Sequence, residues 1–138
     1  MPDLGVAAAK AILAENFAAW VLDLGLEVES VSSGAAVLRM PYSERLVRVG
    51  GTVCGQALMS AADTAMVIAL CGSFGGFKPV TTVSQNVTFM RPIAAQDVLV
   101  EARVIRLGKT LAFGEISMRG AKDGKVAAHA TTTYAILG

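Results

Sequence analysis

The sequence predicts an α+β fold in which an antiparallel β-sheet wraps around one long central α-helix. The segment from about Thr52 to Cys71 is rich in Ala, Leu and Met and is apolar nearly all round, which favours a helix that is covered on most of its faces. Two short β segments precede this helix and four longer ones follow it, with turn residues between them. A single sheet of this kind leaves edges exposed, so we expect a second subunit.

The N-terminal part of the chain, residues 1–25, is predicted to form a helix that packs on the domain. Its apolar residues recur at helical spacing. The side chains expected to pack are Ile12, Leu13, Phe17 and Trp20. Two strands follow, "LEVESV" and "AAVLRMP", joined by the turn residues "SSG". The stretch "YSERLVRVGG" is expected to be a loop that leads into the central helix, and the glycines of "CGSFGGF" are expected to end that helix.

The remainder of the chain is predicted to be four strands in a meander. The first is "VTTVSQNVTFMRP", rich in β-branched residues, which stops at Pro92. In "DVLVEARVIR" apolar and charged residues alternate, so that Val98, Val100 and Ala102 share one face. The segments "TLAFGEISMR" and "VAAHATTTYAIL" follow, and "KDGK" between them is a hairpin signal.

Composition predicts a single domain over residues 1–138, in the cytoplasm. The chain is 54% hydrophobic and 17% charged, and its formal net charge of +1 offers no basic surface for nucleic acid. The mean hydropathy of +0.56 is explained either by a membrane or by apolar surface buried between subunits. We favour subunit contacts, because the longest apolar stretch, "TAMVIALCGSFGGF", is too short to span a bilayer and the acid-containing N-terminus has no basic start. The spacing of Cys54 and Cys71 predicts neither a disulfide nor a metal site.

Asp63 is the one charged residue between Val49 and Phe77. An unpaired buried carboxylate costs several kcal/mol, roughly, so a partner is expected. One interpretation is structural: Asp63 bonds Ser60 or caps a local kink. The other is functional: the carboxylate is a base or nucleophile in a dry pocket. The residues alone do not favour one over the other.

Three segments resemble the hotdog-fold acyl-CoA thioesterases: "RVGGTVCGQALMSAADTAM", "VTTVSQNVTFMRP" and "RLGKTLAFGEISM". The subfamily they resemble most contains the phenylacetate-pathway thioesterase and thioesterase superfamily member 2. Its signature is an Asn, then a His-Gly-Gly, then an Asp nine residues after the His. In this chain Arg48 stands at the Asn, Cys54 at the His, Gly55 and Gln56 at the two glycines, and Asp63 at the Asp.

The resemblance implies the hydrolysis of an acyl-CoA thioester without a metal or a bound cofactor, coenzyme A being part of the substrate. The backbone N–H of Gly55 would polarise the carbonyl, Asp63 would attack it or activate water, and Thr82 would orient the water or the carboxylate. Cys54 and Gln56 would contact the substrate, and so would Arg91 and Lys109, whose stretches resemble those that line the coenzyme A tunnel. The family's dimers often pair into tetramers, so a homodimer, and from it a homotetramer, is expected.

Spacing along the helix adds a requirement of its own. Gly55 and Asp63 are eight positions apart, which is roughly 12 Å along one helix and too far to hold a single carbonyl between them. One site can use both residues only if they come from different subunits. The sequence therefore predicts two equivalent sites across a two-fold interface.

Two departures from the signature affect the activity that we expect. Arg48 offers a bidentate partner for a substrate carboxylate, or pairs with the partner subunit's Asp63. Cys54 is either a nucleophile at the start of a helix or a small buried apolar side chain. We therefore expect an altered or weak acyl preference. The rival predictions are a non-catalytic hotdog protein that binds acyl-CoA or has a structural role and, ranked last, a dehydratase or hydratase, because the one histidine, His129, lies on the last strand.

Overall fold

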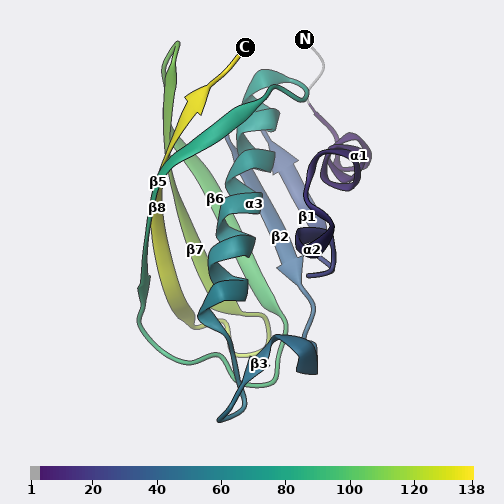
Figure 1. Ribbon diagram of the computed structural model, residues 1–138, viewed down its shortest axis with the longest axis vertical. Helices are drawn as coiled ribbons and strands as arrows, with labels where there is room; N and C mark the ends of the chain where they lie inside the picture. The colour runs from purple at the N-terminus through teal and green to yellow at the C-terminus, as the bar shows by residue number, and fades with distance from the viewer. Residues whose placement is uncertain (1–3) are drawn as a thin grey trace.

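A computed structural model describes residues 4–138 as a six-stranded antiparallel sheet that curves around the long helix α3 (Figure 1). The helical segments are α1 (Val6–Asn16), α2 (Ala19–Leu22), the 3-10 turn η1 (Glu44–Leu46) and α3 (Gly55–Phe74). The strands of the sheet are β1 (Glu27–Ser32), β2 (Ala35–Met40), β5 (Val80–Phe89), β6 (Val98–Leu107), β7 (Leu111–Gly120) and β8 (Val126–Ile136). A separate short hairpin consists of β3 (Val47–Arg48) and β4 (Thr52–Val53). The predicted α+β class is confirmed.

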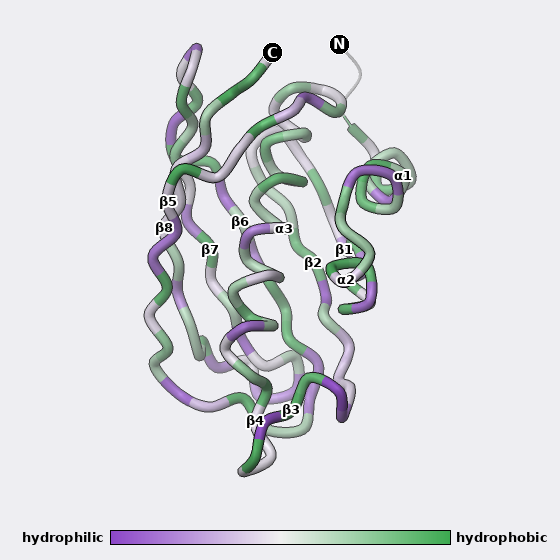
Figure 2. The backbone as a smooth tube through the Cα atoms, in the orientation of Figure 1, coloured by the Kyte–Doolittle hydropathy of each residue, from purple (hydrophilic) through white to green (hydrophobic). Residues whose placement is uncertain are grey.

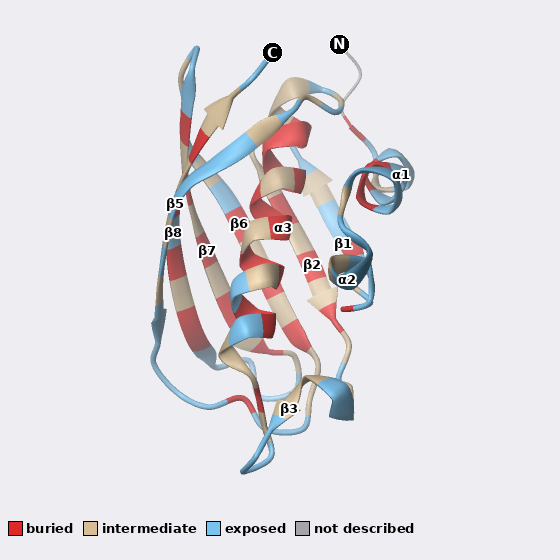
Figure 3. Cartoon of the chain, viewed as in Figure 1, coloured by how far each residue is buried: buried red, intermediate tan, exposed pale blue. Residues whose placement is uncertain are grey.

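The core lies between α3 and the concave face of the sheet. Hydrophobic residues run along α3 and the strands (Figure 2), and the buried positions on α3 turn toward the sheet (Figure 3). Two glycines let the layers approach closely. A Cβ atom at Gly72 would run into the backbone oxygen of Ser32, and one at Gly114 would run into the side chain of Met66. The packing therefore depends on both residues lacking a side chain.

The helix α3 is longer than the apolar stretch that the sequence suggests. Its 20 residues have a mean hydropathy of 1.6 over the most apolar window, which by length and composition alone is enough to cross a membrane. However, 67% of that window is buried inside the fold. Most of the apolar surface of α3 is therefore buried within the fold.

The strand order is β1-β2-β6-β7-β8-β5, so the prediction of a four-strand meander is wrong for its first strand. Of these four strands, β6, β7 and β8 follow one another as neighbours, whereas β5 does not pair with β6. Both edges of β6 are occupied, one by β2 and the other by β7. The chain therefore crosses from β5 through residues 90–97 to reach β6, and β5 pairs with the free edge of β8.

The predicted N-terminal helix is correct only in part, and its residues 1–3 lie outside the described part of the chain. The helix stops at Asn16, whose side-chain amide donates to the Ile12 carbonyl at 2.9 Å, and Phe17 is extended. Ile12 and Leu13 are buried as predicted and Phe17 is half-buried, but Trp20 lies on the separate helix α2 and is 59% exposed. The expectation that Trp20 packs on the domain as part of the same helix is wrong. The helix breaks after Asn16, so Trp20 lies on α2 with its side chain largely exposed.

The approach to α3 also differs from the prediction. The expected loop contains the hairpin β3–β4, and α3 begins at Gly55 rather than near Thr52. Cys54 is the N-cap residue, with an extended backbone (φ −70°, ψ 148°). Gly75 ends the helix in the left-handed region (φ 77°), as the glycines predicted.

Candidate active site

Asp63 is half-buried on α3 and faces the far end of the sheet, where β5 and β8 pair. The Thr82 hydroxyl on β5 donates to Asp63 Oδ1 at 3.0 Å, and the Tyr134 hydroxyl on β8 donates to the same oxygen. Ser60 is not a partner, because its hydroxyl donates to the Gln56 carbonyl at 2.9 Å. The carboxylate is therefore held by the sheet and not by its own helix, and of the predicted site residues Thr82 and Asp63 come together.

Tyr134 is the residue of this cluster that sequence analysis missed. Its side chain is 1% exposed. Burial, and after it the nearby charge of Asp63, raise the pKa of the Tyr134 hydroxyl well above its ordinary value, so the hydroxyl remains a donor. A signal was present: Ala128, Ala130 and Tyr134 alternate on one side of the last strand, and a phenol on an apolar face requires a polar partner.

A β-bulge in β5 sets the geometry of this cluster. The register of β5 against β8 shifts between Thr82 and Ser84, so that Val83 is the extra residue. Thr82 then lies opposite Tyr134, and Gln85 opposite Thr132, on the face that looks toward α3. Gln85 Nε2 donates to the Met59 carbonyl at 2.9 Å. Without the bulge, residues three apart would point to opposite faces, so the bulge lets both side chains reach α3.

A cavity of about 440 Å³ lies beside the first turn of α3, and we call it the Arg48 cavity. It brings together three predicted site residues, Arg48, Gly55 and Arg91. The other lining residues are Thr52, Val53, Leu58, Phe89, Met90, Pro92 and Ile93. Arg48 Nη1 donates to the Thr52 hydroxyl at 3.1 Å. Two guanidinium groups at the start of a helix make this cavity suited to an anionic group.

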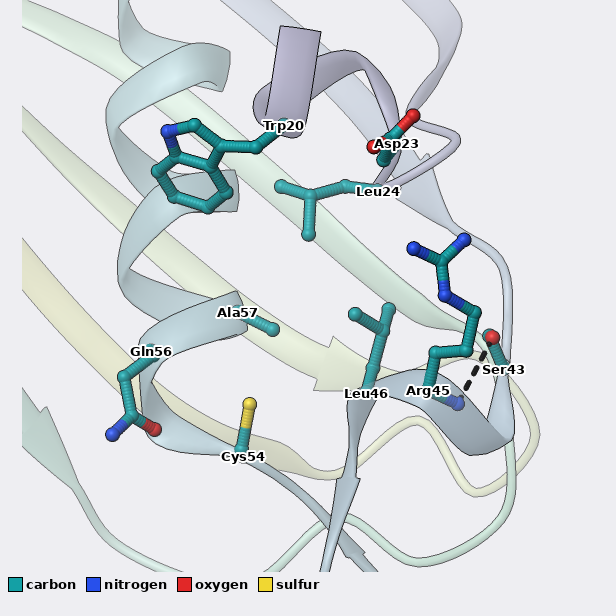
Figure 4. Close-up of a pocket in the computed structure, with 9 residues that line it drawn as sticks. All are labelled: Trp20, Asp23, Leu24, Ser43, Arg45, Leu46, Cys54, Gln56 and Ala57. Carbon is teal, nitrogen blue, oxygen red and sulfur yellow. Dashed lines mark hydrogen bonds between the residues drawn. The ribbon is translucent and has the colours of Figure 1, made fainter.

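A second cavity, of about 240 Å³, lies beside the same turn, between α2 and α3, and we call it the Trp20 cavity (Figure 4). It is lined by Cys54 and Gln56, two further predicted residues, together with Trp20, Asp23, Leu24, Ser43, Arg45, Leu46 and Ala57. The Cys54 sulfur and the side chains of Leu24 and Leu46 point into a common space below the indole. This cavity is mainly apolar, with charge only from Asp23 and Arg45.

One predicted site residue, Lys109, remains apart from these groups within one chain, as does the one histidine, which was not predicted to belong to the site. Lys109 is exposed in the turn between β6 and β7, away from the first turn of α3. His129 is on the outer face of the sheet, 3.4 Å from Glu115, where it cannot serve Cys54 as a base. Gly55 and Asp63 lie on one helix, eight positions apart, as the distance argument requires. Among residues 4–138, no three His, Cys, Asp or Glu side chains gather as metal ligands would.

The chain matches the model of a known protein family over more than half of its length. The model of the thioesterase superfamily matches residues 50–127, which include α3, Asp63 and Thr82. The chain belongs to the thioesterase superfamily. Its α+β architecture is accordingly the hotdog fold, and the resemblance inferred from the sequence is confirmed.

Relatives and solved structures agree with this assignment. The thioesterase-superfamily chain is 32% identical to a protein of Saccharolobus solfataricus that is named as a candidate esterase, over 83% of this chain and 80% of the relative. It is 29% identical to human acyl-coenzyme A thioesterase 13, over 75% and 74%. The structure of zebrafish thioesterase superfamily member 2 matches 96% of this chain and 95% of its own, with 27% identity and a TM-score of 0.82. This chain is thus a distant relative of esterases and acyl-CoA thioesterases.

Proposed function

We propose that this protein is an acyl-CoA thioesterase, which converts an acyl-CoA and water to a carboxylate and coenzyme A. The observation that carries the proposal is the carboxylate of Asp63, which stands at the family's Asp position and accepts hydrogen bonds from two other elements of the fold. A purely structural acid would need only satisfied oxygens. This one is half-buried, and only one of its two oxygens accepts a hydrogen bond from residues 4–138.

Asp63 acts as the nucleophile or as the general base. As a base, it takes a proton from water while the water oxygen bonds to the thioester carbon; the C–S bond then breaks, and Asp63 returns this proton to the leaving sulfur. As a nucleophile, it forms an anhydride with the acyl group and releases the thiolate, and water then hydrolyses the anhydride. In both routes the carbonyl oxygen gains negative charge, which the free N–H of Gly55 at the start of α3 stabilises.

A complete site requires two copies of the chain. β5 is an edge strand of the sheet. Its apolar side chains Val83 and Phe89 are exposed, and so is Met59 on α3. Antiparallel pairing of two β5 strands would cover them. A two-fold axis near Met59, midway between Gly55 and Asp63, would bring each Gly55 opposite the partner subunit's Asp63. Such a dimer is the basis of the proposed homotetramer.

The two cavities beside the first turn of α3 are proposed to bind different parts of the substrate. Arg48 and Arg91 provide charge for the phosphates of coenzyme A, and Lys109 is proposed as a further contact. The Trp20 cavity is proposed to hold the acyl group, because its walls are mainly apolar and Cys54 and Gln56 border Gly55. The presence of Arg45 in this cavity favours acyl groups that carry a polar end.

Replacing Asp63 by Asn tests the proposed function. We expect the release of thiol from a panel of short, medium, aromatic and dicarboxylic acyl-CoAs to fall by about 10²–10⁴-fold in kcat, because the amide neither attacks nor takes a proton. Glu15→Gln, an exposed acid on α1, is the matched control and keeps full activity. Turnover that survives in Asp63→Asn contradicts the proposed role.

The second candidate is a non-catalytic protein that binds acyl-CoA. Two residues favour it, since Arg48 and Cys54 replace the family's Asn and His. Binding of a non-hydrolysable acyl-CoA analogue, together with no turnover across the panel, would support this candidate. A dehydratase or hydratase is disfavoured by the place of His129, on the outer face of the sheet beside Glu115.

A further inference from the structure

The two hydrogen bonds that Asp63 accepts fall on the same oxygen. Thr82 and Tyr134 both donate to Oδ1, and no donor among residues 4–138 contacts Oδ2. The two carboxylate oxygens are therefore in different environments, although they are chemically equivalent in a free side chain. One is fixed to the sheet, and the other is left for a ligand or water.

Of the two donors, Tyr134 is the more firmly fixed. Its ring is buried between β5 and β7, opposite Thr82 on one side and Ala112 on the other. Thr82, by contrast, is exposed on the edge strand. The Tyr134 hydroxyl also lies 3.2 Å from the Asp63 backbone carbonyl, but it has one proton, and Oδ1 is the nearer acceptor. The phenol thus fixes both the position of Asp63 and the direction in which its carboxylate points.

We infer that Tyr134 is a positioning residue for Asp63: its hydroxyl fixes Oδ1 and thereby presents Oδ2 as the atom that attacks the thioester or takes the proton from water. The inference rests on the proposed function. It adds that a residue of the last strand, outside the family's signature, controls the direction in which the working carboxylate points.

The kcat and KM of Tyr134→Phe test this role, because the variant keeps the buried ring and removes only the hydroxyl. Without this donor Oδ1 is held by Thr82 alone, and Oδ2 points less often toward the reacting atoms. The loss of a hydrogen bond to a charged group corresponds to a fall in kcat of about 10–100-fold. We expect KM to change little, because the change affects the reacting group and not the binding cavities.

Thr132→Val is the matched control. Thr132 lies on the same strand and the same face, two positions from Tyr134, and its hydroxyl is buried without a partner among the described residues. Removing this hydroxyl should leave kcat and KM unchanged. If Tyr134→Phe folds with the wild-type circular dichroism and keeps the wild-type kcat, or if Thr132→Val lowers kcat equally, the inference is overturned.

A second measurement requires no activity, which separates this inference from the proposed function. Proton NMR of the wild type should show a slowly exchanging, downfield hydroxyl proton that is absent in Tyr134→Phe and moves upfield in Asp63→Asn. If this signal behaves as expected while no acyl-CoA is hydrolysed, the proposed function fails but the coupling of Tyr134 to Asp63 stands. If the signal does not respond to Asp63→Asn, the hydrogen bond on which the inference depends is contradicted.

Discussion

The partners of Asp63 come from the sheet, which its position in the sequence does not reveal. A half-buried carboxylate on an apolar helix loses hydration, which is costly unless donors replace the water. Thr82 and Tyr134 supply such donors from two strands of the sheet. The helix contributes none of them, so the local interpretation based on Ser60 does not hold.

The proposed role of the Gly55 backbone N–H as an oxyanion donor can be tested with one substitution. Gly55→Pro removes the N–H at the first position of α3, where proline is tolerated, and Cys54 already has the extended backbone (φ −70°, ψ 148°) that precedes a proline. We expect kcat to fall by about 10²–10³-fold, the usual effect of losing one oxyanion donor. The measurement is thiol release from the best acyl-CoA of the panel.

Gly55→Ala is the control for that variant, because it adds a Cβ but keeps the N–H. The new Cβ would lie 3.2 Å from the end of the Phe89 ring, a contact that the Cβ of Gly55→Pro would make as well. Gly55→Ala should retain most of the activity. Equal losses in the two variants would assign the effect to crowding and would contradict a role for the N–H.

At the scale of elements, the approach of α3 to the sheet is set by residues without side chains. Gly72→Ala would place a Cβ against the backbone oxygen of Ser32, which cannot move without disturbing the β1–β2 turn. We expect the free energy of unfolding to fall by about 1–3 kcal/mol, as in other overpacked cores. Denaturant unfolding measures this change.

Gly76→Ala is the matched control, since nothing lies within 4 Å of a Cβ at that position. It should change the stability little. Helix propensity alone gives the opposite expectation for Gly72, because alanine stabilises a helix interior by about 1 kcal/mol relative to glycine. A Gly72→Ala protein that is more stable than the wild type would therefore contradict the close approach of α3 and β1.

Most elements could be predicted from the sequence because their signals are local. The apolar run of α3, the alternation in β6 and the "KDGK" turn each depend on neighbouring residues. The place of β5 depends on which strand edges remain free, a property of the whole sheet, so it was predicted wrongly. The bulge at Val83 and the break after Asn16 also have no strong local signal.

Some residues of the candidate site could also be predicted from the sequence, and others could not. Asp63 and Gly55 follow from the family's signature and Thr82 from the wider resemblance, but Tyr134 is 71 positions from Asp63 and lies outside both. The pairing of β8 with β5 places it opposite Thr82, and the packing of the sheet on α3 brings its hydroxyl to the carboxylate. Arg48 and Arg91 were predicted separately, and the fold brings them to one cavity.

At the scale of the whole molecule, one chain cannot assemble the proposed site. The N–H of Gly55 and the carboxylate of Asp63 are on one straight helix, roughly 12 Å apart, and β5 leaves an apolar edge uncovered beside them. The proposed second copy, related by a two-fold axis, would account for both features. We therefore propose that each active site is shared between two protomers.

Mixing two inactive variants tests whether each active site is formed by two protomers. Asp63→Asn and Gly55→Pro are unfolded together, refolded as a mixture and assayed for thiol release, with mixed oligomers verified by mass spectrometry. In a mixed dimer one of the two sites has both an intact Asp63 and an intact Gly55, so random pairing should restore about a quarter of the wild-type activity. Mixed oligomers that form but stay as inactive as each variant alone would contradict a site shared between protomers.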